Sequence, residues 1–249
     1  MTTSESASLG ILFVLITGLI AGTISGIVGT GSSIMLMPVL VYEYGPKQAV
    51  PIMAVAAVLA NVSRVAAWWR EVDWRACAAY SLAGIPAAAL GARTLLLLPS
   101  RAVDIAIGVF LIAMVPVRHL LARHEIKANL WHLALGGAVI GYLTGIVVST
   151  GPLSVPLFLF YGLAKGAFLA TEAASSLGIY LSKSVTFERF GALTSDLVLK
   201  GLAAGASLMA GAFIAKRFVL RLEPDMFRLI MDAIMLAAGL SILWTAASS

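Results

Sequence analysis

Charged residues are scarce in this sequence, and their scarcity excludes a water-soluble fold. Of its 249 residues only 12% are Asp, Glu, Lys or Arg and 60% are hydrophobic, and the mean hydropathy is +0.98. Soluble domains carry about 25% charged residues. No polar stretch is long enough for a second, soluble domain. We therefore expect residues 1–249 to form one domain that lies in a lipid bilayer.

Groups that support catalysis or metal binding are also scarce. The single cysteine, Cys77, excludes an intramolecular disulfide and any multi-cysteine metal site. The three histidines have no metal-ligating company, and the sequence contains no P-loop and no nucleophile paired with a base. The net charge of +5 comes from basic residues scattered at segment ends rather than from a run. We therefore expect no metal, no cofactor, no nucleic-acid partner and no enzyme activity.

Long apolar segments recur from one end of the chain to the other. Stretches of about 20 residues suffice to cross a hydrocarbon core about 30 Å thick. They predict an all-α integral membrane fold with helices over 9–28, 32–44, 50–69, 76–98, 103–121, 130–148, 153–163, 167–187, 197–214 and 227–244. The segments at 32–44 and 153–163 follow glycine-containing breaks and are too short to span the bilayer alone. We interpret them as half-helices.

An internal repeat divides the chain into residues 9–122 and residues 129–245. The motif GxxxGIV begins at Gly22 and again at Gly141, an offset of 119 residues. A break and a proline follow each copy, in GTGSSIMLMPVL (29–40) and STGPLSVPLFL (149–159). Farther along, Arg64 falls opposite Lys183 at the same offset. Repeats of this kind are typical of secondary transporters.

The basic residues discriminate between two ways of threading the chain through the membrane. If each break is a re-entrant hairpin, each half has three spanning helices, and the cations outside the apolar stretches divide ten to five between the two sides. If each break lies within a discontinuous span, they divide eight to seven. The charge bias favours the first arrangement, an inverted repeat with both termini outside.

Two cations lie inside apolar segments at equivalent positions of the repeat, Arg64 and Lys183. A charge at that depth is costly unless it faces a cavity or a partner. We expect both to contribute to an anion site between the halves. The alternative is that their long side chains reach the headgroups. Asn61 and Tyr180, each three residues before one of these cations, share their helix faces and are expected in the same site.

The glycine breaks are the second part of the predicted site. A helix that begins within the membrane presents free backbone N–H groups, which favour an anion. Hydroxyl groups in the breaks would add neutral donors. The residues predicted to bind substrate here are Gly29, Thr30, Gly31, Ser32, Ser33, Ser149, Thr150 and Gly151. The GxxxG glycines, by contrast, are expected only to let helices approach closely.

Glu172 is an acidic residue inside an apolar stretch. It lies eleven residues before Lys183, too far along one helix to pair with it. It could carry a coupled proton or lie near the membrane surface, and the sequence leaves both open. The small-residue stretches 84–91 and 201–211 could likewise serve internal packing or a homodimer interface.

Three stretches together resemble the TauE/SafE family of sulfite and organosulfonate exporters: GTISGIVGTGSSIMLMPVL (22–40), ANVSRVAAWWREVDW (60–74) and GYLTGIVVSTGPLSVPLFL (141–159). Val72-Asp73-Trp74 matches the family pattern, whereas Ser32 and Ser33 replace two of its glycines. The resemblance implies export of sulfite or an organosulfonate such as sulfoacetate across the plasma (inner) membrane by a multi-pass secondary transporter. The alternatives are a channel-like anion pathway or transport of another small organic anion.

Overall fold

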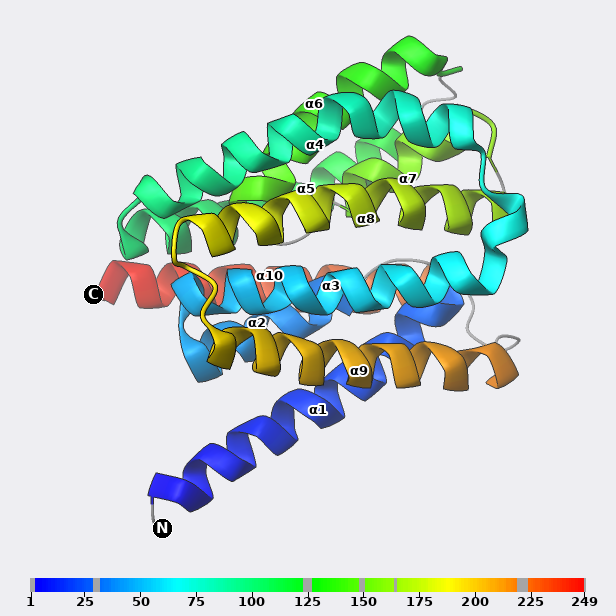
Figure 1. Ribbon diagram of the computed structural model, residues 1–249. Coiled ribbons are helices and arrows are strands. Elements are labelled where there is room, and N and C mark those ends of the chain that lie inside the picture. The colour runs from blue at the N-terminus through cyan, green and yellow to red at the C-terminus, as the bar shows by residue number, and fades with distance from the viewer. Residues whose placement is uncertain are drawn as a thin grey trace.

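The computed structural model describes residues 3–28, 32–122, 127–147, 151–163, 165–218 and 224–248. All regular secondary structure in these ranges is helical. In chain order the helices are α1 (Thr3–Val28), α2 (Ser32–Tyr44), α3 (Pro46–Trp68), the short 3-10 helix η1 (Trp69–Glu71), α4 (Trp74–Leu97), α5 (Ser100–Ala122), α6 (Leu130–Ile146), α7 (Gly151–Phe160), α8 (Lys165–Arg189), α9 (Ser195–Phe218) and α10 (Pro224–Ser248), arranged as in Figure 1.

Each predicted helix corresponds to one α-helix of the structure, with shifted ends. α1 begins at Thr3 rather than at residue 9, because residues 3–8 contain neither proline nor glycine to stop it. α7 occupies Gly151–Phe160 rather than 153–163. Its end is fixed by Gly162, whose φ of 100° is a left-handed conformation that suits glycine, and whose N–H donates to the Leu159 carbonyl at 2.9 Å.

The two helices that follow the breaks are short, as predicted. α2 has 13 residues and α7 has 10, which corresponds to about 20 Å and about 15 Å at 1.5 Å per residue. Each contains the proline of its break motif, Pro38 or Pro156. α1 packs against α2 and α6 packs against α7, so each short helix contacts the helix that precedes it.

Glycines let two pairs of helices pack backbone against backbone. α4 packs along α6, where Gly141 meets the backbone of Gly84, and Gly145 meets the backbone of Ala88 and Gly91. α1 packs along α9 in the same way, with Gly22 against the backbone of Leu208. The expectation that the GxxxG glycines serve close packing is confirmed for Gly22, Gly141 and Gly145. The glycines of 84–91 and 201–211 also contact neighbouring helices of the same chain, and a homodimer stays a prediction.

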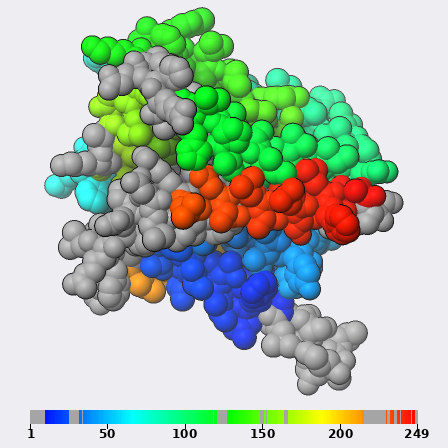
Figure 2. All heavy atoms as spheres, turned by 180° about the vertical axis from the view of Figure 1, so that it is seen from behind, coloured from blue at the N-terminus to red at the C-terminus, as the bar shows by residue number. Residues whose placement is uncertain are grey.

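The helices of the two halves are interleaved rather than side by side. α3 packs against α8 and α9, and α8 packs against α3 and α4. In Figure 1, α4 and α6 lie at the top, α1 and α9 at the bottom, and α3 and α8 between them. The view from behind in Figure 2 shows α10 in orange and red beneath the green α5, with which it packs. Among the three described stretches that are long enough to cross a bilayer, Pro46–Glu71, which comprises α3 and η1, is the most enclosed.

The outer surface of the described residues is apolar. Leu82 and Leu97 on α4 are both 78% exposed, and further large apolar side chains are exposed on α1, α5, α6, α9 and α10. Three described helical stretches are long and apolar enough to cross a bilayer, namely Pro46–Glu71, Trp74–Leu97 and Ser195–Ile214, and Gly10–Ser25, Met35–Tyr44 and Leu130–Ile146 are shorter apolar ones. A surface of this kind is compatible with lipid rather than with water.

Candidate functional site

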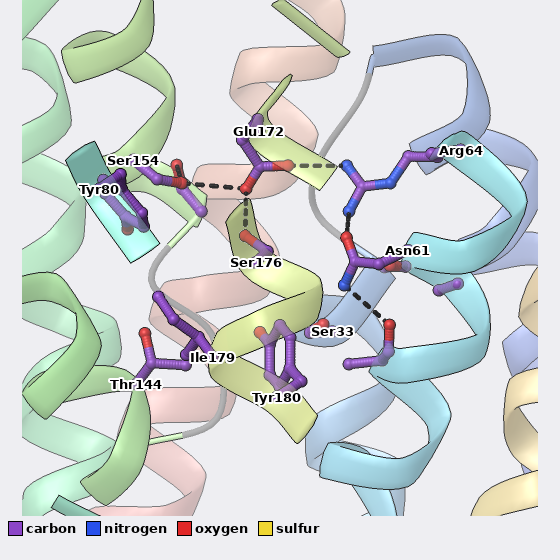
Figure 3. A pocket seen from close by; sticks show the side chains of 14 residues that line it. Ser33, Asn61, Arg64, Tyr80, Thr144, Ser154, Glu172, Ser176, Ile179 and Tyr180 are labelled. Atoms are coloured by element: carbon purple, nitrogen blue, oxygen red, sulfur yellow. Dashed lines mark hydrogen bonds and ion pairs between the residues drawn. The ribbon is translucent and has the colours of Figure 1, made fainter. Parts of the chain in front are cut away.

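A polar cavity lies where the first turns of α2 and α7 meet α3 and α8. Most of its lining is polar although the surrounding helices are apolar. Its lining residues are Ser32, Ser33, Ala57, Ala60, Asn61, Arg64, Tyr80, Thr144, Gly151, Ser154, Glu172, Ser176, Ile179 and Tyr180 (Figure 3). Both halves of the chain contribute, so the cavity lies between them.

The first turns of the two short helices form one wall of this cavity. Ser32 and Ser33 begin α2, and Gly151 and Ser154 lie in the first turn of α7. The side chains of both α2 serines and of Ser154 are buried. The first N–H groups of any helix lack partners within that helix, and they carry its positive dipole end. Two such ends beside one cavity favour a negatively charged occupant.

Arg64 and Glu172 form an ion pair inside the cavity. Arg64 Nη1 lies 3.1 Å from Glu172 Oε2, and the two side chains are 16% and 5% exposed. Arg64 Nη2 donates to Asn61 Oδ1, and Asn61 Nδ2 in turn donates to the Ala57 carbonyl at 2.7 Å. Because Asn61 precedes Arg64 by three residues on α3, the amide orients the guanidinium from the same helix face. The Asn61–Arg64–Glu172 chain of contacts runs from α3 to α8 (Figure 3).

The second oxygen of Glu172 is also occupied. Oε1 accepts hydrogen bonds from Ser176 at 2.9 Å and from Ser154 at 3.2 Å. Ser176 lies one turn along α8, whereas Ser154 comes from α7. A buried carboxylate is costly unless it is paired and hydrogen-bonded. Glu172 meets both conditions, and it links α3, α7 and α8 through its two oxygens.

The remaining wall carries aromatic and hydroxyl groups. Tyr80 of α4 and Tyr180 of α8 are both buried. The Tyr80 ring packs against Phe158 of α7, with the ring centroids 5.0 Å apart. Thr144, near the end of α6, donates through Oγ1 to the Ile140 carbonyl at 2.6 Å. The side chains of Tyr80, Tyr180 and Thr144 thus form an aromatic and hydroxyl-bearing wall of the cavity.

Lys183 lies beside the cavity rather than in its described lining. Its Nζ donates to the backbone carbonyls of Thr144 at 2.6 Å and Val147 at 2.8 Å, at the C-terminal end of α6. The side chain is 1% exposed and its Nζ lies 5.7 Å from the Phe187 ring centroid. A cation at a helix C-terminus compensates the negative dipole end and the unpaired carbonyls. Lys183 therefore points inward and does not reach the headgroups.

The structure brings together most of the residues that the sequence nominated. Asn61, Arg64, Tyr180, Ser32, Ser33 and Gly151 line one cavity, together with Glu172. Gly29, Thr30, Gly31, Ser149 and Thr150 lie outside the described residues. Glu172 is buried and lines this cavity, and its role as a carrier of a coupled proton stays a prediction.

Sequence reasoning missed Tyr80, Thr144, Ser154 and Ser176. Ser176 could have been found, because it lies four residues from both Glu172 and Tyr180 and therefore on the same face of one helix. Tyr80 and Thr144 carry no such signal. They come from α4 and α6, and only the packing of those helices brings them to the cavity.

The sequence matches one protein family and two known proteins. The family model described as "Sulfite exporter TauE/SafE" matches residues 14–242. The chain is 22% identical over 257 aligned residues to "Probable membrane transporter protein YjnA" of Bacillus subtilis (strain 168), covering 92% of this chain and 98% of that protein. It is 29% identical over 191 residues to "Probable membrane transporter protein y4hK" of Sinorhizobium fredii (strain NBRC 101917 / NGR234), covering 70% and 73%. No solved structure matches the chain.

Proposed function

The chain belongs to the TauE/SafE family of membrane transporters, and we propose that it is a secondary transporter that exports a small sulfur-containing anion by alternating access. The observation that carries the proposal is the cavity between the halves, where Arg64 and the first turns of α2 and α7 converge. Midplane sites with half-helix ends at their walls are typical of transporters built from repeats.

The lining favours an anion with several oxygens. The Arg64 guanidinium is a planar fork that matches oxyanions, and the N-terminal turns of α2 and α7 add backbone donors. The hydroxyls of Ser32 and Ser33 add neutral donors at the point where the family pattern has glycines. Sulfite and organosulfonates such as sulfoacetate present oxygens of this kind, and they are our proposed substrates.

Lys183 contributes to this site from a distance in our proposal. Its ammonium is held by the Thr144 carbonyl, while the Thr144 side chain lines the cavity. Thr144 therefore separates the Lys183 ammonium from the cavity. The charge of Lys183 adds to the positive potential in the cavity without contacting a bound anion. We propose that Arg64 binds the anion and Lys183 fixes the end of α6.

We further propose that the two halves are inverted repeats, each with a re-entrant hairpin and three spanning helices. The packing of α1 on α9 has its counterpart in α6 on α4, and α3 on α9 has its counterpart in α8 on α4. The colour gradient of Figure 1 runs in opposite directions along α3 and α8, and both chain ends lie at the same edge. Rocking of the helices α1, α3 and α9 against the helices α4, α6 and α8 would then expose the cavity to each side in turn, in a multi-pass protein of the plasma (inner) membrane.

Counterflow in proteoliposomes tests this function. Vesicles loaded with unlabelled sulfite or sulfoacetate are expected to accumulate the labelled anion transiently, with an initial rate that saturates. A carrier exchanges substrate in this way, whereas a channel-like pathway gives flux that neither saturates nor exchanges. If neither anion exchanges, other small organic anions are tested in the same vesicles, and the sulfur-anion assignment is withdrawn.

A further inference from the structure

We propose that Glu172 is an internal counter-ion that the transported anion displaces from Arg64, and that Glu172 takes up one proton as it is displaced. One proton then moves with each anion. The inference rests on the proposed function and extends it, because it assigns the coupling ion and the group that carries it.

Competition for Arg64 follows from the geometry of the cavity. Arg64 directs Nη1 to Glu172 Oε2 at 3.1 Å and Nη2 to Asn61 Oδ1. These contacts engage both Nη atoms, which form the fork that a guanidinium offers to a bidentate anion. A sulfonate or sulfite, like a carboxylate, carries negative charge on oxygens that accept hydrogen bonds from a guanidinium. We therefore infer that an anion bound to this fork takes the place of Glu172.

Displacement would leave two anions beside one cation. Among the described residues that line the cavity, Arg64 is the sole cation and Glu172 the sole anion. Glu172 is 5% exposed, so water screens little of the repulsion between its carboxylate and a bound anion. Uptake of a proton removes the repulsion. The donors Ser176 and Ser154 can turn to accept from the protonated carboxyl, because a hydroxyl both donates and accepts.

No other titratable side chain among the described residues that line the cavity supplies that proton or a second positive charge. From α4 the group at the cavity is Tyr80, and from α8 itself it is Tyr180, both neutral phenols. From α6 and α7 the lining groups are Thr144, Gly151 and Ser154. η1 packs on α8 with Glu71 beside Gly166, before the turn that carries Glu172. Lys183 is held by the end of α6.

The proton therefore comes from water on the side to which the cavity is open. It returns to water when the anion leaves and the Arg64–Glu172 pair forms again. The Arg64–Glu172 pair has no net charge, and neither has the cavity with a bound monoanion such as hydrogen sulfite, since Glu172 is then neutral. A bound dianion such as sulfoacetate leaves one negative charge in the low-dielectric interior. Net export of a monoanion then requires an outward anion gradient larger than any inward proton gradient, and export of a dianion is also driven by a cytoplasm-negative membrane potential.

The repeat supports the assignment of a single proton carrier. The position that matches Glu172 at the offset of 119 is Met53, a buried apolar residue of α3. The matching position of Arg64 is Lys183, which is a cation as well. Both halves therefore have a cation at the equivalent position, Arg64 or Lys183, whereas only the second half has the carboxylate, Glu172. This leaves one titratable acid for one bound anion.

Proton uptake on binding tests the inference on the full chain in detergent. Sulfoacetate is fully ionised at neutral pH, so any proton taken up belongs to the protein. Calorimetric titration in two buffers of different ionisation enthalpy should give about one proton per bound anion. Glu172→Gln should bind sulfoacetate about tenfold more tightly or better, without proton uptake, because the internal competitor is gone. The control is Glu188→Gln, the same change at an exposed position of α8, which should behave as the wild type.

The outcomes separate the inference from the function on which it rests. Binding by the wild type without proton uptake would overturn the coupling and leave the transporter in place, and so would uptake that persists in Glu172→Gln. Wild-type protein that binds neither sulfoacetate nor sulfite would remove the sulfur-anion function, and the inference with it. A wild-type count of zero overturns the inference even if Glu172→Gln does not fold.

Discussion

Arg64 on α3 and Glu172 on α8 form an ion pair of 3.1 Å that joins the two halves of the chain inside one cavity. The two residues are 108 positions apart in the sequence, and each is also held by a polar neighbour on its own helix. The proposed binding of substrate and the contact between the halves therefore involve the same side chain, Arg64. This relationship makes Arg64 the residue on which the proposed anion site depends.

Asn61→Ala should weaken substrate binding without unfolding the protein. Asn61 accepts from Arg64 Nη2 and so helps to hold the guanidinium in the cavity. A hydrogen bond to a charged group contributes about 1.5 kcal/mol, which corresponds to about a tenfold rise in KM for counterflow. The control is Ser63→Ala, which removes a buried hydroxyl from the same helix outside the described cavity lining. Equal KM values for the two variants would argue against this role of Asn61.

Lys183→Met should lower the stability of the protein. The change leaves the carbonyls of Thr144 and Val147 without the ammonium that now pairs with them. Buried acceptors that lose their donor cost about 1 to 3 kcal/mol each, so we expect a clearly lower unfolding midpoint in detergent. Lys200→Met is the control, because its ion pair with Asp196 is an i,i+4 surface pair of small value. A stable Lys183→Met protein that no longer exchanges anions would instead place Lys183 in the binding site itself.

Two adjacent glycines of α6 should differ in their tolerance of alanine. A Cβ at Gly137 would meet the backbone of Tyr80 on α4, whereas a Cβ at Gly136 would meet only the flexible end of the Leu157 side chain. Overpacking against backbone costs about 1 to 3 kcal/mol. We expect Gly137→Ala to lower the unfolding midpoint and Gly136→Ala to have little effect. The reverse order would mean that α4 and α6 do not pack as described.

Substrate should protect a cysteine placed at Ser33 from a water-soluble thiol reagent. Ser33 lies in the first turn of α2 and lines the cavity with Arg64. In a Cys77→Ala background, sulfoacetate should slow the labelling of Ser33→Cys about tenfold when present at ten times its Kd, because the bound anion fills the cavity. Ser195→Cys, at the exposed first residue of α9, is the control. Unchanged labelling of Ser33→Cys in the presence of substrate would separate α2 from the anion site.

The sequence predicted the helices well, because the length and hydropathy of an apolar run are local properties. The half-helices could also be predicted, since Pro38 and Pro156 mark equivalent breaks in the repeat. The termini were less predictable. The polar residues before Leu9 belong to α1 because nothing in them stops the helix. No residue pattern in the sequence marks Thr3 as its beginning.

The site was predictable in its composition and not in its contacts. Arg64, Asn61 and Tyr180 follow from the repeat and from helical spacing. The pairing of Arg64 with Glu172 does not, because it arises from the packing of α3 on α8. The contacts of Lys183 could not be predicted from the sequence either. The carbonyls that accept from its Nζ lie at the end of α6, and only the packing of α6 against α8 brings them to Lys183.

The most direct test of the account is the counterflow of labelled sulfite and sulfoacetate by Arg64→Gln beside the wild type. Arg101→Gln, at an exposed position of α5, provides the matched loss of one guanidinium. We predict saturable exchange by the wild type and by Arg101→Gln, and a loss of at least about a hundredfold in Arg64→Gln, because losing one partner of a buried, hydrogen-bonded charge pair costs about 2 to 5 kcal/mol of binding. The unfolding midpoint of Arg64→Gln should also fall, because Glu172 then lacks its cation. Undiminished exchange by a folded Arg64→Gln protein would contradict the account and place the anion site elsewhere.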